Sequence, residues 1–146
     1  MTMDVLAEET QRFVDDHRIA RLATASSKAE PHVIPLCYAR IDGRIYFVID
    51  EKPKKTRTGL KRMQNICANP QVALVIDDYD EDWKQLAYLL LQGTAMIVED
   101  EAEYRQALKQ LRLRYLQYVA MPIEFNTNPM VRIDVRQAKL WKSATA

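Results

Sequence analysis

The stretch "PHVIPLCYARIDGRIYFVID", residues 31–50, carries the strongest fold signal in the chain. Its two apolar runs, 31–40 and 44–50, are typical of β-strands, and Asp42-Gly43 between them is a hairpin signal. Pro31 and Pro35 have no backbone N–H for a neighbouring strand. They therefore indicate an edge strand, a bulge, or a face where something other than a strand receives hydrogen bonds.

The segments on either side of this hairpin predict a mainly antiparallel β protein. Further strands are expected at 19–26, 71–79, 85–100 and 130–141, and helices at 4–19, 58–70 and 100–119. Asp4 and Thr58 are the expected N-caps of the first two helices, and Gly93 indicates a bend, a bulge or a close backbone approach. Six strands joined largely by hairpins favour a sheet that closes into a barrel, because closure removes its edges.

Composition narrows the class of protein. The chain has 146 residues, a formal net charge of +1 and two cysteines, which fits one domain, 1–146, with neither a disulfide framework nor a metal site. The near-zero net charge argues against a nucleic-acid-binding protein. No apolar run is long enough to span a membrane and the first residues do not resemble a signal peptide, so we expect a cytoplasmic protein without a membrane partner.

Positive charge is concentrated in one short segment, although the net charge of the whole chain is near zero. Six cations lie in residues 51–66: Lys52, Lys54, Lys55, Arg57, Lys61 and Arg62. The stretch precedes a predicted helix start, whose free N–H groups favour anions, and Thr56 adds a hydroxyl donor. We interpret it as a phosphate-binding segment. The alternatives are a solvated surface loop and a nucleic-acid contact, and the latter lacks interleaved aromatic residues for base stacking.

The order of several short motifs resembles the pyridoxamine 5'-phosphate oxidase-like FMN-binding split-barrel family. The motifs are "RLAT" (21–24), "PHVIPLCY" (31–38), "IYF" (45–47), the basic segment and "LKRMQNICANPQVAL" (60–74). "DEKPKKT" (50–56), "DDYDEDW" (77–83) and "GTAMIV" (93–98) are most similar to its probable F420-dependent enzymes. The resemblance extends over residues 17–141. The chain lacks the substrate-phosphate pattern of true pyridoxamine phosphate oxidases, so that activity is not assigned.

This resemblance implies a six-stranded antiparallel split β-barrel with flanking helices, which forms a homodimer with its cofactor at the subunit interface. The cofactor would be F420 or FMN. Its ring would lie along the second strand and its phosphate at the basic segment. The implied cofactor-binding residues are Ile34, Pro35, Leu36, Cys37, Val48, Ile49, Lys52, Lys54, Lys55, Thr56, Lys61, Arg62 and Trp141.

The implied activity is hydride transfer between this cofactor and a small organic substrate. The cofactor supplies such chemistry itself, so no catalytic residue is assigned. The surplus of lysines favours F420, which has an anionic tail, over FMN. Tyr79, Trp83 and Tyr88 are candidates for the substrate rim or for ordinary packing, and Cys37 fits a packed core cysteine better than a catalytic thiol. The alternative function is a non-catalytic flavin or heme carrier or sensor.

Overall fold

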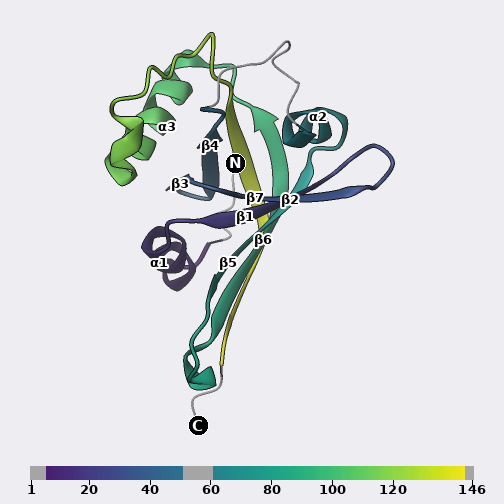
Figure 1. The fold of residues 1–146 in the computed structure, drawn as a ribbon, viewed down its shortest axis with the longest axis vertical. Helices are drawn as coiled ribbons and strands as arrows, with labels where there is room; N and C mark the ends of the chain where they lie inside the picture. Colours follow the sequence, from purple (N-terminus) through teal and green to yellow (C-terminus); the bar gives the residue numbers. More distant parts are fainter. Residues whose placement is uncertain (1–5, 51–60, 144–146) are drawn as a thin grey trace.

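The computed structural model describes residues 6–50 and 61–143. In these ranges the chain forms one curled antiparallel sheet with helices packed around it (Figure 1). The strands are β1 (Ala20–Ala25), β2 (Pro31–Leu36), β3 (Ala39–Ile41), β4 (Arg44–Val48), β5 (Gln71–Asp78), β6 (Ala87–Ile97) and β7 (Met130–Lys142). The α-helices are α1 (Glu8–Asp16), α2 (Lys61–Ala68) and α3 (Glu101–Arg114), and the 3₁₀ turns are η1 (Trp83–Gln85) and η2 (Leu116–Tyr118).

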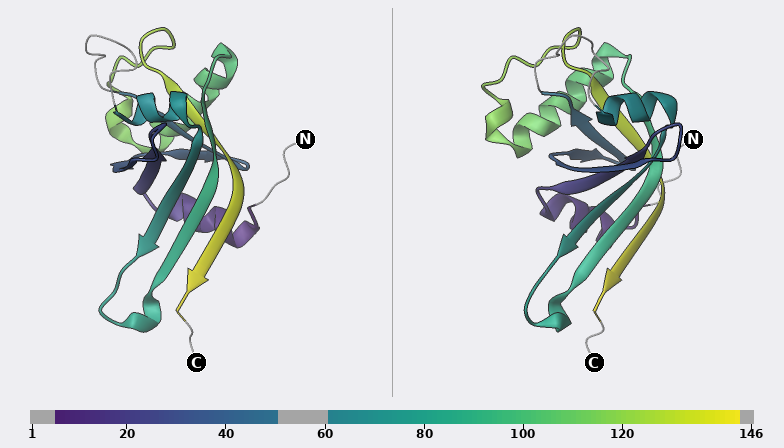
Figure 2. Two further views of the ribbon diagram at one scale, coloured as in Figure 1. Left: turned by 90° about the vertical axis from the view of Figure 1, so that its right-hand side faces the viewer. Right: turned by 45° about the vertical axis from the view of Figure 1, so that its right-hand side comes forward.

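The sheet is a split barrel. Its strand order is β2-β1-β5-β6-β7-β4-β3, so β2 and β3 form its two ends. Only Cys37 and Tyr38 separate these two strands in the chain, and the two ends of the sheet must therefore approach each other there. The views in Figure 2 show the resulting curl, and also a long arm formed by β5, β6 and β7 that extends away from the helices to η1.

The expected strand 31–40 is two strands, so the described part of the chain has seven strands rather than the expected six. The reason is a side chain that takes the place of a neighbouring strand. The Tyr38 N–H donates to Tyr115 Oη at 3.1 Å, and the Tyr115 hydroxyl donates to the Tyr38 carbonyl at 2.9 Å. With both backbone groups of Tyr38 satisfied in this way, the chain can leave one end of the sheet and join the other.

Local signals in the sequence explain several of the observed elements. β2 lies at an end of the sheet, as its two prolines predict, and Asp42-Gly43 joins β3 to β4 with Ile41 opposite Arg44. The register of β6 against β7 shifts between Gln92 and Gly93. A Cβ at Gly93 would come within 2.3 Å of the Asp134 carbonyl oxygen, so both the bulge and the close approach are confirmed.

Helices α1 and α3 are shorter than the periodicity predicts. α1 begins at Glu8 with Ala7 at its N-cap, so the expected start at Asp4 is wrong. α3 ends at Arg114 because the chain turns into η2, although Tyr104, Leu108, Leu111 and Tyr115 are all buried as predicted. Thr58, the expected cap of α2, lies outside the described residues.

Two apolar cores hold the helices in place. The larger one fills the barrel beneath α1 and α2 and includes Phe13, Leu22, Met63, Leu74 and Leu89. The second lies between α3 and the β3–β4 hairpin and includes Tyr46, Tyr104, Leu111 and Met130. Within the described residues, no helix has the length and apolar character needed to cross a bilayer.

Candidate functional site

A cavity of about 440 Å³ opens where β2 ends, β4 ends and α2 begins. This volume is within the range of small-molecule sites. Its lining residues are Ile19, Ile34, Pro35, Leu36, Cys37, Phe47, Val48, Asp50, Arg62 and Tyr118. The cavity therefore combines an apolar wall, which suits a flat ring, with one cation, one carboxylate, one thiol and one phenol.

The structure brings together about half of the site residues expected from the sequence. Ile34, Pro35, Leu36, Cys37 and Val48 share this cavity with Arg62. These positions come from three segments, which are β2 with the residue that follows it, the end of β4, and the start of α2.

The remaining expected residues have other surroundings. Ile49 is buried in the larger core, and Lys61 is exposed and is not among the residues that line the cavity. Trp141 is 40% exposed on the arm, where its ring stacks on Tyr88 at a centroid distance of 5.5 Å. Lys52, Lys54, Lys55 and Thr56 lie outside the described residues. For all of these, a role in cofactor binding stays a prediction.

Helix α2 is fixed so that Arg62 reaches the cavity. Asn65, one turn after Arg62, donates from Nδ2 to Thr24 Oγ1 on β1 at 2.9 Å, and both side chains are buried. Met63 and Ile66 pack into the barrel core on the same helix. One polar and two apolar contacts thus hold α2 against the sheet, and this places Arg62 at the cavity.

Four lining residues were missed by sequence reasoning: Ile19, Phe47, Asp50 and Tyr118. Asp50 follows the strand residues Val48 and Ile49 and directly precedes the cationic segment, so its place at the end of a strand was a usable signal. Tyr118 gave no local signal, because the sequence pattern placed it within a helix extending to residue 119. Its entry into the cavity depends on the turn η2.

The polar groups of the cavity influence one another. Burial raises the pKa of the Cys37 thiol, and the nearby Asp50 carboxylate raises it further. Burial also raises the pKa of the Tyr118 phenol well above its usual range, again with Asp50 as the next contribution. At neutral pH both groups are therefore protonated and can donate hydrogen bonds to a ligand.

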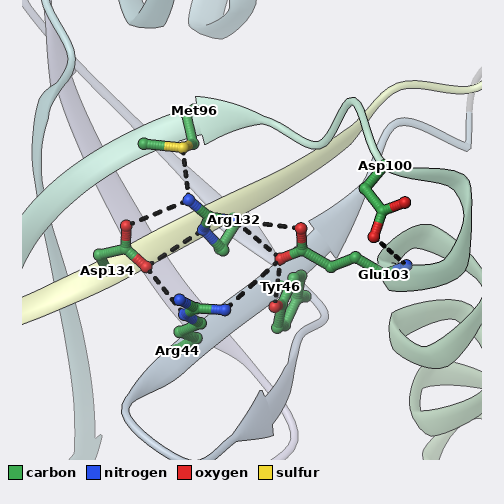
Figure 3. Close-up of polar contacts among 7 residues, drawn as sticks. All are labelled: Arg44, Tyr46, Met96, Asp100, Glu103, Arg132 and Asp134. Atoms are coloured by element: carbon green, nitrogen blue, oxygen red, sulfur yellow. Dashed lines mark hydrogen bonds and ion pairs between the residues drawn. The ribbon is translucent and has the colours of Figure 1, made fainter. Parts of the chain in front are cut away.

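A second cavity, of about 560 Å³, lies beside α3, and two of its lining residues, Glu103 and Arg132, are paired with each other. Figure 3 shows Glu103 of α3 accepting hydrogen bonds from Tyr46 Oη at 2.6 Å and from Arg132 Nη1 at 2.9 and 3.1 Å. Asp134 pairs with both Arg44 and Arg132. Two cations thus neutralise two carboxylates, and we interpret this cluster as a structural tie between α3 and the sheet.

Comparison with known protein families identifies the family of this chain. The family model for pyridoxamine 5'-phosphate oxidase matches residues 6–142. The chain belongs to the pyridoxamine 5'-phosphate oxidase family. The match covers every described strand and helix, and it confirms the resemblance seen in the motifs around residues 21–74.

Solved structures of this family's fold include proteins with different ligands. A conserved hypothetical protein from Mycobacterium tuberculosis is 24% identical, with a TM-score of 0.74, over 98% of this chain and 90% of that one. An FAD-binding protein from Mesorhizobium loti is 20% identical, with a TM-score of 0.69, over 92% of each chain. HutZ, a heme storage protein from Vibrio cholerae, is 17% identical, with a TM-score of 0.68, over 97% and 95%. At these identities the likeness establishes the fold. No curated protein matches the sequence.

Proposed function

We propose that this member of the pyridoxamine 5'-phosphate oxidase family is an oxidoreductase that binds FMN or F420 in the 440 Å³ cavity and acts on a small organic substrate. The observation that carries the proposal is that the apolar end of β2 and Arg62 of α2 line the same cavity. A ring with an attached phosphate needs this combination, an apolar wall beside a cation.

The residues present fit such a cofactor. Ile34, Leu36 and Val48 offer apolar contacts to a ring, and Arg62 offers a guanidinium that can pair with a phosphate through two hydrogen bonds. Asp50 would repel the phosphate, so we expect the phosphate at Arg62 and the ring nearer to Asp50. When bound, the cofactor supplies the hydride chemistry. The residues of the chain bind it, orient it and exclude water from one face.

The choice between FMN and F420 rests on residues outside the described part of the chain. F420 carries an anionic tail beyond its phosphate, and Lys52, Lys54 and Lys55 would be available for that tail. This surplus of charge favours F420, whereas Arg62 serves either cofactor.

We further propose a homodimer in which a second copy covers the outer apolar face of the sheet, defined by Ala23, Val33, Ala73, Val75 and Leu90. The register places Val33 opposite Ala23, Ala23 opposite Ala73, and Val75 opposite Leu90, so these side chains lie on one face of the sheet. The same face also carries Arg21 opposite Val75 and Gln92 opposite Ala73. Val33 is 61% exposed. Pro35, two residues later on β2, lines the cavity, and a partner on this face would therefore also approach the cofactor.

The alternative is a heme carrier or sensor, as the fold likeness to HutZ suggests. The two histidines, His17 and His32, are both described, and neither is among the cavity-lining residues of the described chain. Cys37 and Tyr118 could ligate iron only as anions, and the raised pKa of each group disfavours that form. The cavity therefore favours a flavin or deazaflavin over heme.

The test is to add FMN, F420 and heme separately to purified protein, remove unbound ligand, and record the absorbance spectrum and intact mass. The proposal expects FMN or F420 to stay bound and the loaded protein to oxidise or reduce a small electron acceptor or donor. Retention of heme alone, with a heme absorption band, would overturn the proposal in favour of the alternative.

A further inference from the structure

Two ion pairs join helix α1 to the long arm of the sheet, one near each end of the helix. Glu9, in the first turn of α1, pairs with Lys142 at the end of β7 at 2.9 Å. His17, the C-cap of α1, pairs through Nε2 with Asp78 Oδ1 at the end of β5, at 2.6 Å. Strands β5 and β7 lie on either side of β6, so α1 bridges the two outer strands of the arm.

The ring of His17 has a hydrogen-bond partner at each nitrogen. Nδ1 lies 2.7 Å from the carbonyl oxygen of Phe13, in the last turn of α1, and Nε2 faces the Asp78 carboxylate. A carbonyl oxygen and an ionised carboxylate can only accept hydrogen bonds, so both ring nitrogens must donate. A neutral imidazole carries a proton on one nitrogen only. The two contacts together therefore require the doubly protonated, positively charged ring.

The end of α1 is a place where a positive charge has partners. Asp15 and Asp16 are the last two residues of the helix, where the helix dipole disfavours carboxylates and favours cations. Arg40 pairs with Asp15 at 2.8 Å, and Asp16 lines the same hollow as His17. The charged or titratable groups that face His17 from its own and the neighbouring elements are Asp16, Tyr38, Asp78, Lys84, Arg114 and Lys142.

The backbone of His17 is held independently of its contact with Asp78. Its carbonyl accepts hydrogen bonds from Tyr38 Oη, at 3.0 Å, and from the Arg114 guanidinium. The His17 ring stacks on Phe13 at a centroid distance of 4.2 Å, which also holds Nδ1 beside the Phe13 carbonyl. A ring that loses one proton would keep this local contact and turn a lone pair toward the Asp78 carboxylate. The contact that breaks is therefore the one to β5.

We propose that His17 and Asp78 form a pH-sensitive clasp, which joins α1 to the end of β5 while both ring nitrogens carry protons and releases β5 when the ring loses one. Both residues line a cavity of about 610 Å³ between α1 and the arm, so the clasp is part of the wall of this cavity. Its contribution to stability is present at acidic pH and is lost as the pH rises through the titration of His17. The clasp is independent of any cofactor.

The first experiment follows the ring by ¹⁵N NMR of the full chain, labelled at histidine, between about pH 5.5 and about pH 8. The chain has two histidines, so the His32→Gln variant leaves His17 as the single signal. Both nitrogens of His17 should carry protons at the acidic end. Asp78→Asn should weaken proton binding to the ring about two- to fivefold, the size expected for a partly exposed ion pair. An Nε2 without a proton at the acidic end, or equal proton binding in Asp78→Asn, would overturn the proposal.

The second experiment measures urea unfolding at the two ends of the same pH range. Asp78→Asn should lower the folding equilibrium constant about two- to fivefold at the acidic end and leave it unchanged at the alkaline end. In a His17→Asn background this pH-dependent loss should disappear.

Asp77→Asn is the matched control for the unfolding experiment. Asp77 precedes Asp78 on β5, its side chain is 48% exposed against 50% for Asp78, and it pairs with Arg21 at 3.2 Å. An arginine keeps its charge over this range, so any loss in Asp77→Asn should be the same at both ends. A loss in Asp78→Asn that is equally independent of pH would overturn the clasp.

Discussion

Glu103 is the residue that joins α3 to the sheet by charge. Burial alone would raise the pKa of its carboxyl, but the hydrogen bonds from Tyr46 and Arg132 outweigh burial and lower it. Burial, followed by the hydrogen bond to Glu103, raises the pKa of Tyr46 to about 12. A carboxyl whose pKa is lowered by folding stabilises the native state above its ordinary pKa, and this contribution is lost as pH falls through the lowered value.

We therefore expect Glu103→Gln to reduce the free energy of unfolding by about 1–3 kcal/mol at neutral pH, since hydrogen bonds to a charged acceptor are lost. The difference from wild type should shrink as the pH is lowered below the ordinary carboxyl pKa. Urea unfolding at neutral and acidic pH measures both effects. Glu101→Gln is the matched control, because Glu101 pairs with Arg105 on the exposed face of the same helix and should contribute little. An equal loss for Glu101→Gln and Glu103→Gln would contradict the assignment.

Tyr115 shows how a single side chain can shape neighbouring elements. Its hydroxyl replaces a strand partner for Tyr38, and its ring lies within a cluster that includes the Arg18 guanidinium, 4.9 Å from the ring centroid. The sequence correctly placed Tyr115 on a buried helical stripe. The sequence could not reveal the contact with Tyr38, which lies 77 positions away. For this reason the hairpin at Asp42-Gly43 was predictable and the division of 31–40 into β2 and β3 was not.

Tyr115→Phe should destabilise the fold by about 1–3 kcal/mol, because it leaves the buried Tyr38 N–H without its acceptor. It should also weaken cofactor binding, since Cys37 lies next to Tyr38 on the cavity wall. Thermal unfolding and FMN titration measure the two effects. Tyr79→Phe removes an equivalent hydroxyl from a residue that is 67% exposed and should leave both unchanged. Unaltered stability in Tyr115→Phe would show that the hydroxyl does not hold the junction of β2 and β3.

At the scale of the molecule, the outer apolar face of the sheet explains why we expect a homodimer. Val33→Asp places a charge on a side chain that is exposed in the single chain, so the subunit should still fold. We expect light scattering to give a dimer mass for wild type and a monomer mass for this variant. Leu113→Asp is the control, because Leu113 is 71% exposed on α3 and should not affect the mass. A dimer that survives Val33→Asp would place the interface elsewhere, and a monomeric wild type would contradict the proposal.

The whole molecule also shows where prediction from sequence succeeds. The barrel follows from alternating strands, edge prolines and the hairpin, which are local signals. The apolar wall at Ile34, Leu36 and Val48 was predictable because strand residues near a chain reversal meet at one end of the barrel. That Asp50 and Tyr118 line one cavity could not be predicted from the sequence, because the place of Tyr118 depends on where α3 ends and on how η2 turns.

The most direct test of the central claim compares FMN with riboflavin, which lacks the phosphate, in wild type, Arg62→Ala and Lys61→Ala. If Arg62 holds the phosphate in the cavity, wild type should prefer FMN over riboflavin by roughly ten- to a hundredfold, the value of one strong charge-assisted contact. Arg62→Ala should remove most of this preference without weakening riboflavin, and Lys61→Ala should keep more of the preference than Arg62→Ala because Lys61 is exposed outside the cavity. An Arg62→Ala variant that still prefers FMN as strongly as wild type would contradict the account.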